Sequence, residues 1–272
     1  MPETASVLRA SGLARREGTV QMRGMWVFLA SFAAPGCFRG WSGVLLPWLW
    51  VAAGVLLAGG LGWGLLVAPP DWQQGETVRI LYVHVPAAWL AMGGWTALAL
   101  AGLAHLIWRD ALAGEALAVL ARTGAVFTVV CLATGSLWGR PMWGAWWVWD
   151  ARLTSVLVLL FLYLGVLLLP GAFDDRARGT RAAAILALAG TVNLPVVKFS
   201  VDWWSTLHQP ASITRLDAPA MHASILWPLL VSAAGFALLF VALALWQLRV
   251  GLEERRLERR CQRFVREAGD GG

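Results

Sequence analysis

Residues 153–170 read LTSVLVLLFLYLGVLLLP, a run of 18 residues without a single charged side chain. Because an α-helix rises about 1.5 Å per residue, about 20 such residues cross the roughly 30 Å of hydrocarbon in a bilayer. Apolar runs of this length are typical of transmembrane helices and exceed what most soluble cores need. The run therefore predicts a membrane-spanning helix, and it decides the fold class of the chain.

Five further long and mainly apolar runs surround it, of which the run 118–137 carries Arg122 near its start and the run 181–200 is interrupted by Asn193 and Pro195. They cover residues 45–68, 80–108, 118–137, 181–200 and 218–248. Hydrophobic residues make up 58% of the 272 residues and charged residues only 14%, whereas a soluble domain carries about 25% charged residues. We therefore expect an all-α, polytopic integral membrane protein with six transmembrane helices. An ordinary soluble enzyme and a disordered chain are both excluded.

The remaining residues divide into three shorter segments. Residues 1–24 are polar and rich in Arg, and we expect a disordered N-terminal extension. Residues 25–44 are apolar but interrupted by a Pro-Gly pair, and they are expected to form an interfacial segment. Residues 45–248 would form the six-span membrane domain. Residues 249–272 would form a cytoplasmic tail, in which Glu and Arg at helical spacing predict a continuation of the last helix.

The distribution of basic residues predicts the orientation in the membrane. With the N-terminus inside, 17 of the 22 Lys and Arg residues lie on the inner side. The other five are Arg79, Arg140, Arg152, Lys198 and Arg215. Because cytoplasmic segments are enriched in Lys and Arg, both termini are expected in the cytoplasm. The outer, periplasmic loops would then lie near residues 69–80, 138–152 and 199–218.

The second of these loops is unusually rich in tryptophan. Residues 138–150 read WGRPMWGAWWVWD, which places Trp138, Trp143, Trp146, Trp147 and Trp149 ahead of Asp150. One or two indoles are enough to anchor a helix at a membrane interface. Since indole rings offer a large flat area at low entropic cost, the motif predicts a binding surface for a large, flat, apolar ligand. Asp150 is expected to orient the loop through a hydrogen bond to the backbone or to an outer-face Arg.

Histidines flank this loop on the same expected side of the membrane. His84 lies near the outer end of the second span and His208 lies in the third outer loop, whereas His105 lies near the inner end of the second span. Imidazole is a common ligand of haem iron, so two histidines would hold the iron from both faces. His222, at the outer start of the sixth span, competes with His208, and position alone does not separate the two.

A porphyrin also carries two propionate groups. Guanidinium binds carboxylates through paired hydrogen bonds, so outer-face arginines are natural partners. The candidates are Arg79, Arg140 and Arg152.

Together these segments resemble a known family. The motif 138–150 is similar to the tryptophan-rich WWD signature of haem-handling proteins. The flanking pieces YVHVP, residues 82–86, and WWSTLHQP, residues 203–210, resemble the haem exporter protein C family, cytochrome c maturation protein C (CcmC). The resemblance covers roughly residues 25–248. It implies a protein, not an enzyme, that binds haem at the periplasmic face of the bacterial inner membrane and delivers it to the haem chaperone CcmE.

The resemblance also implies a site and partners. It assigns His84 and His208 as the axial ligands, the motif 138–150 as the haem surface, and Arg79 and Arg152 as functional arginines, with Arg140 inside the motif. The cargo would be haem b, bound without a covalent bond. The expected partners are CcmE, the ABC transporter subunits CcmA and CcmB, the small membrane protein CcmD and membrane lipid, and no nucleic acid.

Two alternatives remain open at this point. A haem lyase of cytochrome c assembly shares the tryptophan motif, but such lyases are normally much longer, with more spans and more histidines. A transporter of another substrate should show polar residues lining a route through the membrane centre. Asn193 is the main polar residue in the middle of a span.

Overall fold

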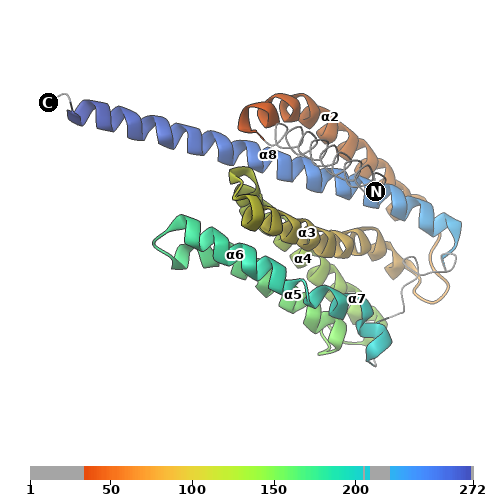
Figure 1. The fold of residues 1–272 in the computed structure, drawn as a ribbon. Coiled ribbons are helices and arrows are strands. Elements are labelled where there is room, and N and C mark those ends of the chain that lie inside the picture. Colours follow the sequence, from red (N-terminus) through yellow and green to blue (C-terminus); the bar gives the residue numbers. More distant parts are fainter. Residues whose placement is uncertain (1–33, 205, 209–220, 271–272) are drawn as a thin grey trace, which may run out of the picture. The chain divides into compact units, whose positions relative to one another are not determined.

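The computed structural model describes residues 34–204, 206–208 and 221–270 (Figure 1). The chain divides into two units, Met1–Leu45 and Leu46–Gly272, which are described separately. In the first unit, helix α2 (Pro35–Gly62) begins, and its first turns are the described part of that unit. The expected disordered extension, residues 1–24, lies outside the described residues. The interfacial segment over residues 25–44 and the domain boundaries drawn from it stay predictions.

The described part of the second unit is built from helices joined by short connections. After α2 come η1 (Trp63–Val67), η2 (Glu76–Ile80), α3 (Leu81–Trp108), α4 (Ala111–Trp143), α5 (Ala151–Leu168), η3 (Leu169–Ala172), α6 (Arg176–Gly190), α7 (Asn193–Trp203) and α8 (Ala223–Asp270). Within the part of the chain that the structure describes, six stretches are long and apolar enough to cross a membrane: Gly36–Val67, Glu76–Trp108, Ala111–Trp143, Ala151–Ala172, Arg176–Trp203 and Ala223–Phe264. This confirms the prediction of an all-α, multi-pass membrane protein with six transmembrane helices.

The fifth span consists of two helices rather than one. α6 ends at Gly190 and α7 begins at Asn193, two residues before Pro195. In a continuous helix Pro195 would lack the N–H that bonds the Thr191 carbonyl and its ring would clash with that carbonyl, so a break just before α7 is favoured. The side-chain amide of Asn193 donates to the carbonyl of Ser155 on α5 at 2.9 Å. This polar residue therefore joins two helices instead of facing an open polar route through the membrane.

Part of the tryptophan motif is helical, although the sequence predicted a loop over these residues. α4 continues to Trp143, so residues 138–143 are helical and the connection to α5 covers residues 144–150. Gly144 ends α4 in the left-handed conformation (φ 77°), which glycine adopts without a Cβ penalty. Asp150 then caps α5 by accepting the N–H of Leu153 at 2.7 Å. The motif thus has a helical half and a non-helical half.

The core of the second unit lies where α3, α4, α5 and α6 meet. Trp95 and Tyr163 are fully buried there and pack edge to face, with 4.8 Å between their ring centroids. The Tyr163 hydroxyl donates to the carbonyl of Ala91 on α3 at 2.7 Å. α6 contributes the buried alanines Ala183 and Ala184, and such small residues let helices approach closely. α3, α4 and α5 are thereby held in fixed positions around the site described below.

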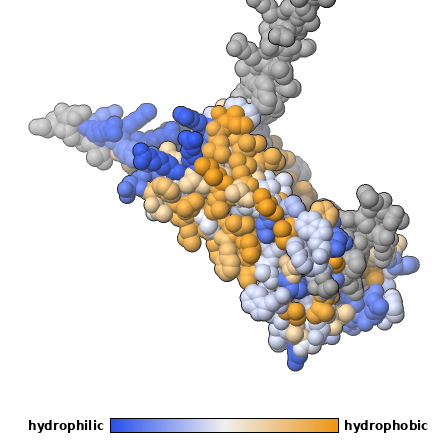
Figure 2. All heavy atoms as spheres, turned by 60° about the horizontal axis from the view of Figure 1, so that its bottom comes forward, coloured by the Kyte–Doolittle hydropathy of each residue, from blue (hydrophilic) through white to orange (hydrophobic). Residues whose placement is uncertain are grey.

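Helix α8 extends well beyond the length that a membrane span needs. It is 48 residues long, which agrees with the expected helical continuation into the charged tail. On this extension Arg255 forms an ion pair with the buried Glu115 of α4. Figure 2 shows hydrophobic side chains gathered over the middle of the helices and hydrophilic ones along the charged extension. The pattern is that of a protein whose middle faces lipid.

Candidate functional site

A cavity of about 510 Å³ lies between α3, α4, α5 and α7. Its volume falls within the range of about 300–1,000 Å³ that is typical of small-molecule sites. Its walls include apolar side chains such as Leu132 and Val156, and three histidines also line it: His84, His208 and His222. The cavity therefore combines an apolar interior with several candidate metal ligands.

His84 projects from the first turn of α3 toward α4. Its Nδ1 lies 3.1 Å from the carbonyl oxygen of Cys131 and 3.1 Å from Oγ1 of Thr134. A carbonyl oxygen only accepts hydrogen bonds, so Nδ1 carries the ring proton and Nε2 keeps a free lone pair. Trp138 meets the ring edge-on, with 5.6 Å between ring centroids. The contacts fix both the orientation and the tautomer of this imidazole.

His208 lies in the non-helical segment that follows α7. Its Nδ1 is 3.3 Å from Oδ2 of Asp150, and its ring packs on Trp143 with 4.8 Å between centroids. The Asp150 side chain is only 5% exposed. Burial lowers the pKa of His208 below its usual value, although the Asp150 carboxylate acts in the opposite direction. A neutral imidazole is the form that binds metal, and a carboxylate on Nδ1 leaves Nε2 as the ligand atom.

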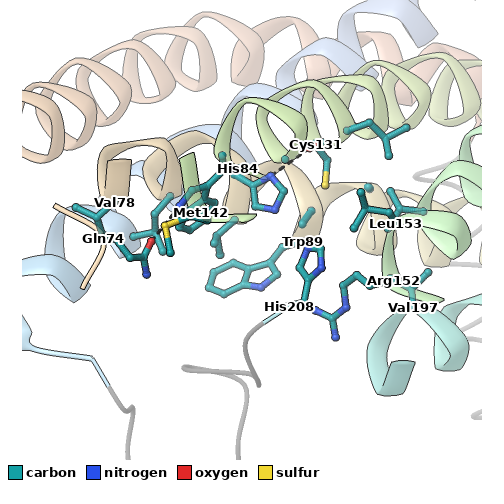
Figure 3. A pocket seen from close by; sticks show the side chains of 18 of the residues that line it. Gln74, Val78, His84, Trp89, Cys131, Met142, Arg152, Leu153, Val197 and His208 are labelled. Carbon is teal, nitrogen blue, oxygen red and sulfur yellow. Dashed lines mark hydrogen bonds between the residues drawn. The ribbon is translucent and has the colours of Figure 1, made fainter. Parts of the chain in front are cut away.

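The two imidazoles face the same cavity from different elements. Figure 3 shows His84 reaching in from α3 and His208 from the segment after α7, on opposite sides of the space between them. Each has its Nδ1 held by a protein oxygen and its Nε2 available. This arrangement can ligate one metal centre from two faces.

The other two histidines are placed differently. His222 lines the cavity, but its side chain is exposed, and its Nδ1 lies 2.8 Å from the Ser224 hydroxyl. His105 does not line the cavity, and its Nδ1 lies 3.1 Å from the carbonyl of Asp110 near the far end of α3. Of His208 and His222, the two candidates for the second ligand, His208 is thus the one whose Nδ1 contacts a buried carboxylate.

The tryptophans of the motif fall into two sets. Trp138 and Trp143, on the helical half, line the cavity. Trp146, Trp147 and Trp149 are not among the described residues that line it. Trp146 and Trp149 are 56% and 76% exposed, and Trp147 packs edge-on against Trp149. The helical half therefore belongs to the cavity and the non-helical half to the surface.

Two further tryptophans were missed by reasoning from sequence. Trp72, in the connection before η2, and Trp89, on α3, both line the cavity. Gln74 from the same connection accepts the Trp138 indole N–H at 2.9 Å, which ties that connection to the motif. The available signal was position, because Trp72 lies in the first expected outer loop and Trp89 lies in the outer third of the expected second span.

Arg152 is the candidate arginine that the structure places in the cavity wall. It lies in the first turn of α5, and its Nε donates to the Ser200 hydroxyl at 3.1 Å. Its Nη2 donates to the carbonyl of Lys198 at 3.3 Å. Since guanidinium has five N–H donors, several remain for a ligand carboxylate.

Arg79 and Arg140 are engaged outside the cavity lining. Arg79 pairs with Glu76 at 2.5 Å and donates to the carbonyl of Leu65 in η1 at 2.6 Å. Arg140 donates to the carbonyl of Gly144 at 2.5 Å and thereby supports the end of α4. In the described residues both side chains have local structural partners, and neither lines the cavity.

Fold and site together define a class of protein: a polytopic helical membrane protein with two oriented histidines and an aromatic wall around one cavity. A family model described as Heme exporter protein C matches residues 28–263. Heme exporter protein C of Bradyrhizobium diazoefficiens is 52% identical over 229 residues, which cover 84% of this chain and 87% of that relative. The Escherichia coli strain K12 protein of that name is 49% identical over 228 residues, covering 83% and 91%. The one from Haemophilus influenzae is 46% identical over 228 residues, covering 84% and 93%. The chain belongs to the heme exporter protein C family.

Proposed function

We propose that this protein binds haem as cargo between His84 and His208, at the periplasmic face of the bacterial inner membrane, and delivers it to the chaperone CcmE during cytochrome c maturation. The supporting observation is the pair of imidazoles that line one cavity and are each held at Nδ1 by a protein oxygen, which leaves Nε2 as the ligand atom. Two imidazoles on opposite faces suit six-coordinate haem iron. Membership of a family named for haem export supports haem as the substrate and agrees with a chain that is not an enzyme.

The cavity walls suit a non-covalently held haem b. Trp138 and Trp143 supply aromatic surface beside the two histidines, and Arg152 offers a guanidinium to a propionate. The exposed Trp146 and Trp149 lie on the same connection as the ligand-orienting Asp150. They provide the surface on which CcmE would dock. CcmA, CcmB and CcmD would join the protein within the membrane, where lipid surrounds the helices.

The alternatives from the sequence receive less support. The chain covers 87% to 93% of the lengths of three relatives named heme exporter protein C, which favours that family over a haem lyase. The Asn193 amide, the main polar group at mid-membrane, is hydrogen-bonded to the carbonyl of Ser155. A transporter of another substrate would need other polar groups along its route.

An optical spectrum of the purified protein tests the proposal. We expect a low-spin, bis-imidazole haem spectrum in the unmodified protein. His84→Gly and His208→Gly should each lose most of the haem, and added imidazole should restore it because the small base fills the vacated ligand position. His105→Gly and His222→Gly are the matched controls and should keep the wild-type spectrum.

The haem content of these variants distinguishes the possible ligand assignments. An unmodified protein that binds no haem would rule out the proposed function. Loss of haem in His222→Gly with normal binding in His208→Gly would move the second ligand to His222. Equal loss in His105→Gly would show that the assay reports folding rather than ligation.

A further inference from the structure

Beside Arg152, the wall of the cavity carries a second cationic side chain that the sequence analysis did not assign to the site. This is Lys198 of α7, the only lysine in the chain. We propose that Lys198 is a carboxylate partner of the bound cargo, so that Arg152 and Lys198 each meet one propionate of the haem. The inference rests on the proposed function, since it concerns the same cavity.

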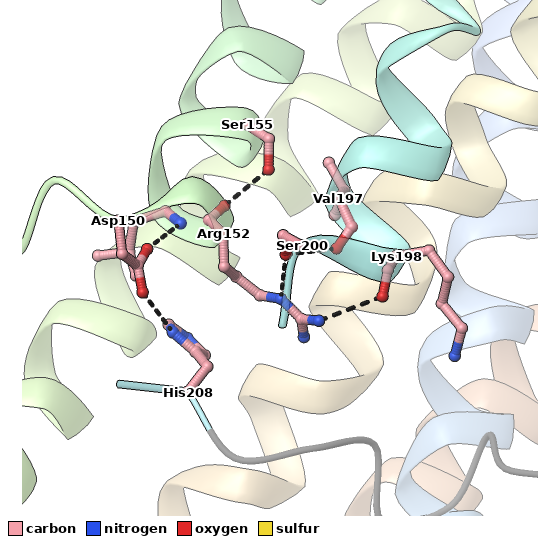
Figure 4. Close-up of polar contacts among 8 residues, drawn as sticks. Asp150, Arg152, Ser155, Val197, Lys198, Ser200 and His208 are labelled. Carbon is pink, nitrogen blue, oxygen red and sulfur yellow. Dashed lines mark hydrogen bonds and ion pairs between the residues drawn. The ribbon is translucent and has the colours of Figure 1, made fainter. Parts of the chain in front are cut away.

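The structure places the two residues next to each other along the cavity wall. Both residues line the cavity, Arg152 from the start of α5 and Lys198 from the middle of α7. Arg152 is bonded to α7 twice, to the Lys198 carbonyl at 3.3 Å and to the Ser200 hydroxyl at 3.1 Å. Figure 4 shows the Arg152 guanidinium between His208 and Lys198. The position of the Arg152 guanidinium is thus set by α7, the helix that also carries Lys198.

The charges around the cavity favour this pairing. Among the described residues that line it, Arg152 and Lys198 are the two cationic side chains apart from the histidines, and Asp71 is the one acidic side chain. Asp150 and Asp202 also lie near Arg152, but they do not line the cavity. A porphyrin carries its two propionates on one edge of the ring. Because an unpaired carboxylate is costly in an apolar environment, two carboxylates on one edge need two adjacent cations. One arginine alone would leave the second propionate without a partner.

The pairing also fixes how the ring would lie between the histidines. In Figure 3, Arg152 and Val197 lie on one side of the two imidazoles, and Gln74 and Met142 lie on the other. With its propionates against α5 and α7, the haem would direct its vinyl edge toward Gln74 and Met142. The charged edge is thereby kept away from Asp71, the acidic lining residue, whose carboxylate accepts the Gln74 N–H at 2.9 Å.

A purely structural role for Lys198 is the competing interpretation. Asp202 follows Lys198 by four residues on α7, which is a favourable spacing for an ion pair within a helix. Such a pair would support α7 whether or not the ligand has carboxylates. The two roles therefore differ in how a Lys198 variant responds to a ligand whose carboxylates are blocked.

The test compares haem with haem dimethyl ester, in which both propionates are esterified. We expect Lys198→Met to bind haem roughly tenfold more weakly than the unmodified protein, because a charge-assisted hydrogen bond is lost. Both proteins should bind the dimethyl ester with equal affinity. Lys198→Arg should restore most of the haem affinity, and Arg122→Met, an exposed charge on α4 outside the cavity, should match the unmodified protein. All four proteins should keep the bis-imidazole spectrum.

Several results would overturn the inference. An equal loss for haem and for its dimethyl ester would assign Lys198 to the stability of α7, and no loss for either ligand would exclude it from binding. If the unmodified protein binds haem with a bis-imidazole spectrum in these cases, the proposed function stands and only the role of Lys198 fails. If the unmodified protein binds neither ligand, the proposed function itself fails.

A chemical cross-link supplies a second readout. A water-soluble carbodiimide activates a propionate, and attack by the Lys198 amine forms an amide while the carbodiimide leaves as a urea. We expect a haem adduct on the peptide that contains Lys198 and none in Lys198→Met. An unmodified protein that binds haem but yields no adduct would contradict contact between the amine and a propionate.

Discussion

At the scale of single residues, Asp150 joins the start of a helix to the orientation of a ligand. One carboxylate oxygen accepts the Leu153 N–H at 2.7 Å and the other lies 3.3 Å from Nδ1 of His208. The side chain is almost completely buried, so both contacts are shielded from water. Because Asp150 is the N-cap of α5, the start of this helix fixes the carboxylate where it can contact His208.

Asp150→Asn and Asp150→Ala should separate these two roles. Asn caps helices about as well as Asp, so Asp150→Asn should keep its melting temperature while haem affinity falls about 10- to 100-fold through loss of the carboxylate on His208. Asp150→Ala should lose haem affinity and also about 1 kcal/mol of stability. Haem titration and thermal unfolding in detergent measure the two effects. Wild-type affinity in Asp150→Asn would contradict the orienting role.

Gly135 lies against the ring of His84, the other proposed ligand, where its lack of a side chain leaves space for the imidazole. A Cβ added to this glycine would lie 3.1 Å from Cε1 of His84, which is tighter than nearly all such contacts in proteins. Gly135→Ala should therefore displace the imidazole and lower haem affinity by about tenfold, as other changes in the surroundings of a metal ligand do. Gly93→Ala on α3 is the control, because a Cβ there would meet nothing within 4 Å. Equal haem titrations for the two variants would show that His84 tolerates the shift.

At the scale of elements, the boundary between α4 and the connection after it divides the tryptophan motif. Trp143 lies before that boundary and contacts His208, whereas Trp146 and Trp149 lie after it and are exposed. Trp143→Leu should weaken haem binding by about 1 kcal/mol, the scale of an aromatic pair. Trp146→Leu combined with Trp149→Leu should leave haem content unchanged but lower the loading of CcmE. Normal loading in this double variant would leave these indoles as membrane anchors.

The sequence predicted the number of membrane spans and their helical type, but not where the individual helices end. Hydropathy alone located six spans, because the bilayer demands long apolar helices. It did not locate the end of α4 at Trp143, since Trp and Gly are common in helices and in loops alike. Pro195, which interrupts the fifth apolar run, indicated the break between α6 and α7, because a proline affects the helix locally.

At the scale of the whole molecule, helix packing decides which of the candidate residues predicted from sequence line the cavity and which do not. His84, Trp138 and Arg152 come from three helices and line one cavity, although nothing in their spacing required it. Arg79 was an equal candidate by position, but Glu76 and the carbonyls of η1 engage it locally. Lys198 lay at the outer end of the expected fifth span, residues 181–200, and became a candidate only through its place beside Arg152. The sequence therefore reveals which residues are charged or aromatic. Whether these residues line the same cavity depends on how the helices pack.

The orientation of the whole molecule in the membrane is the last prediction. All three connections beside the cavity, near residues 71–75, 144–150 and 204–208, must face the periplasm if the cargo is delivered there. The split of 17 inner and 5 outer basic residues predicts this orientation. Alkaline phosphatase fused after Asp71, Trp146 or Gln209 should be active, because the enzyme matures only outside the cytoplasm. Fusions after Asp110 and Asp174, in the opposite connections, should be inactive and serve as controls. An inactive fusion at Trp146 with an active one at Asp174 would turn the cavity toward the cytoplasm, and delivery to a periplasmic chaperone would then be excluded even if haem binding were confirmed.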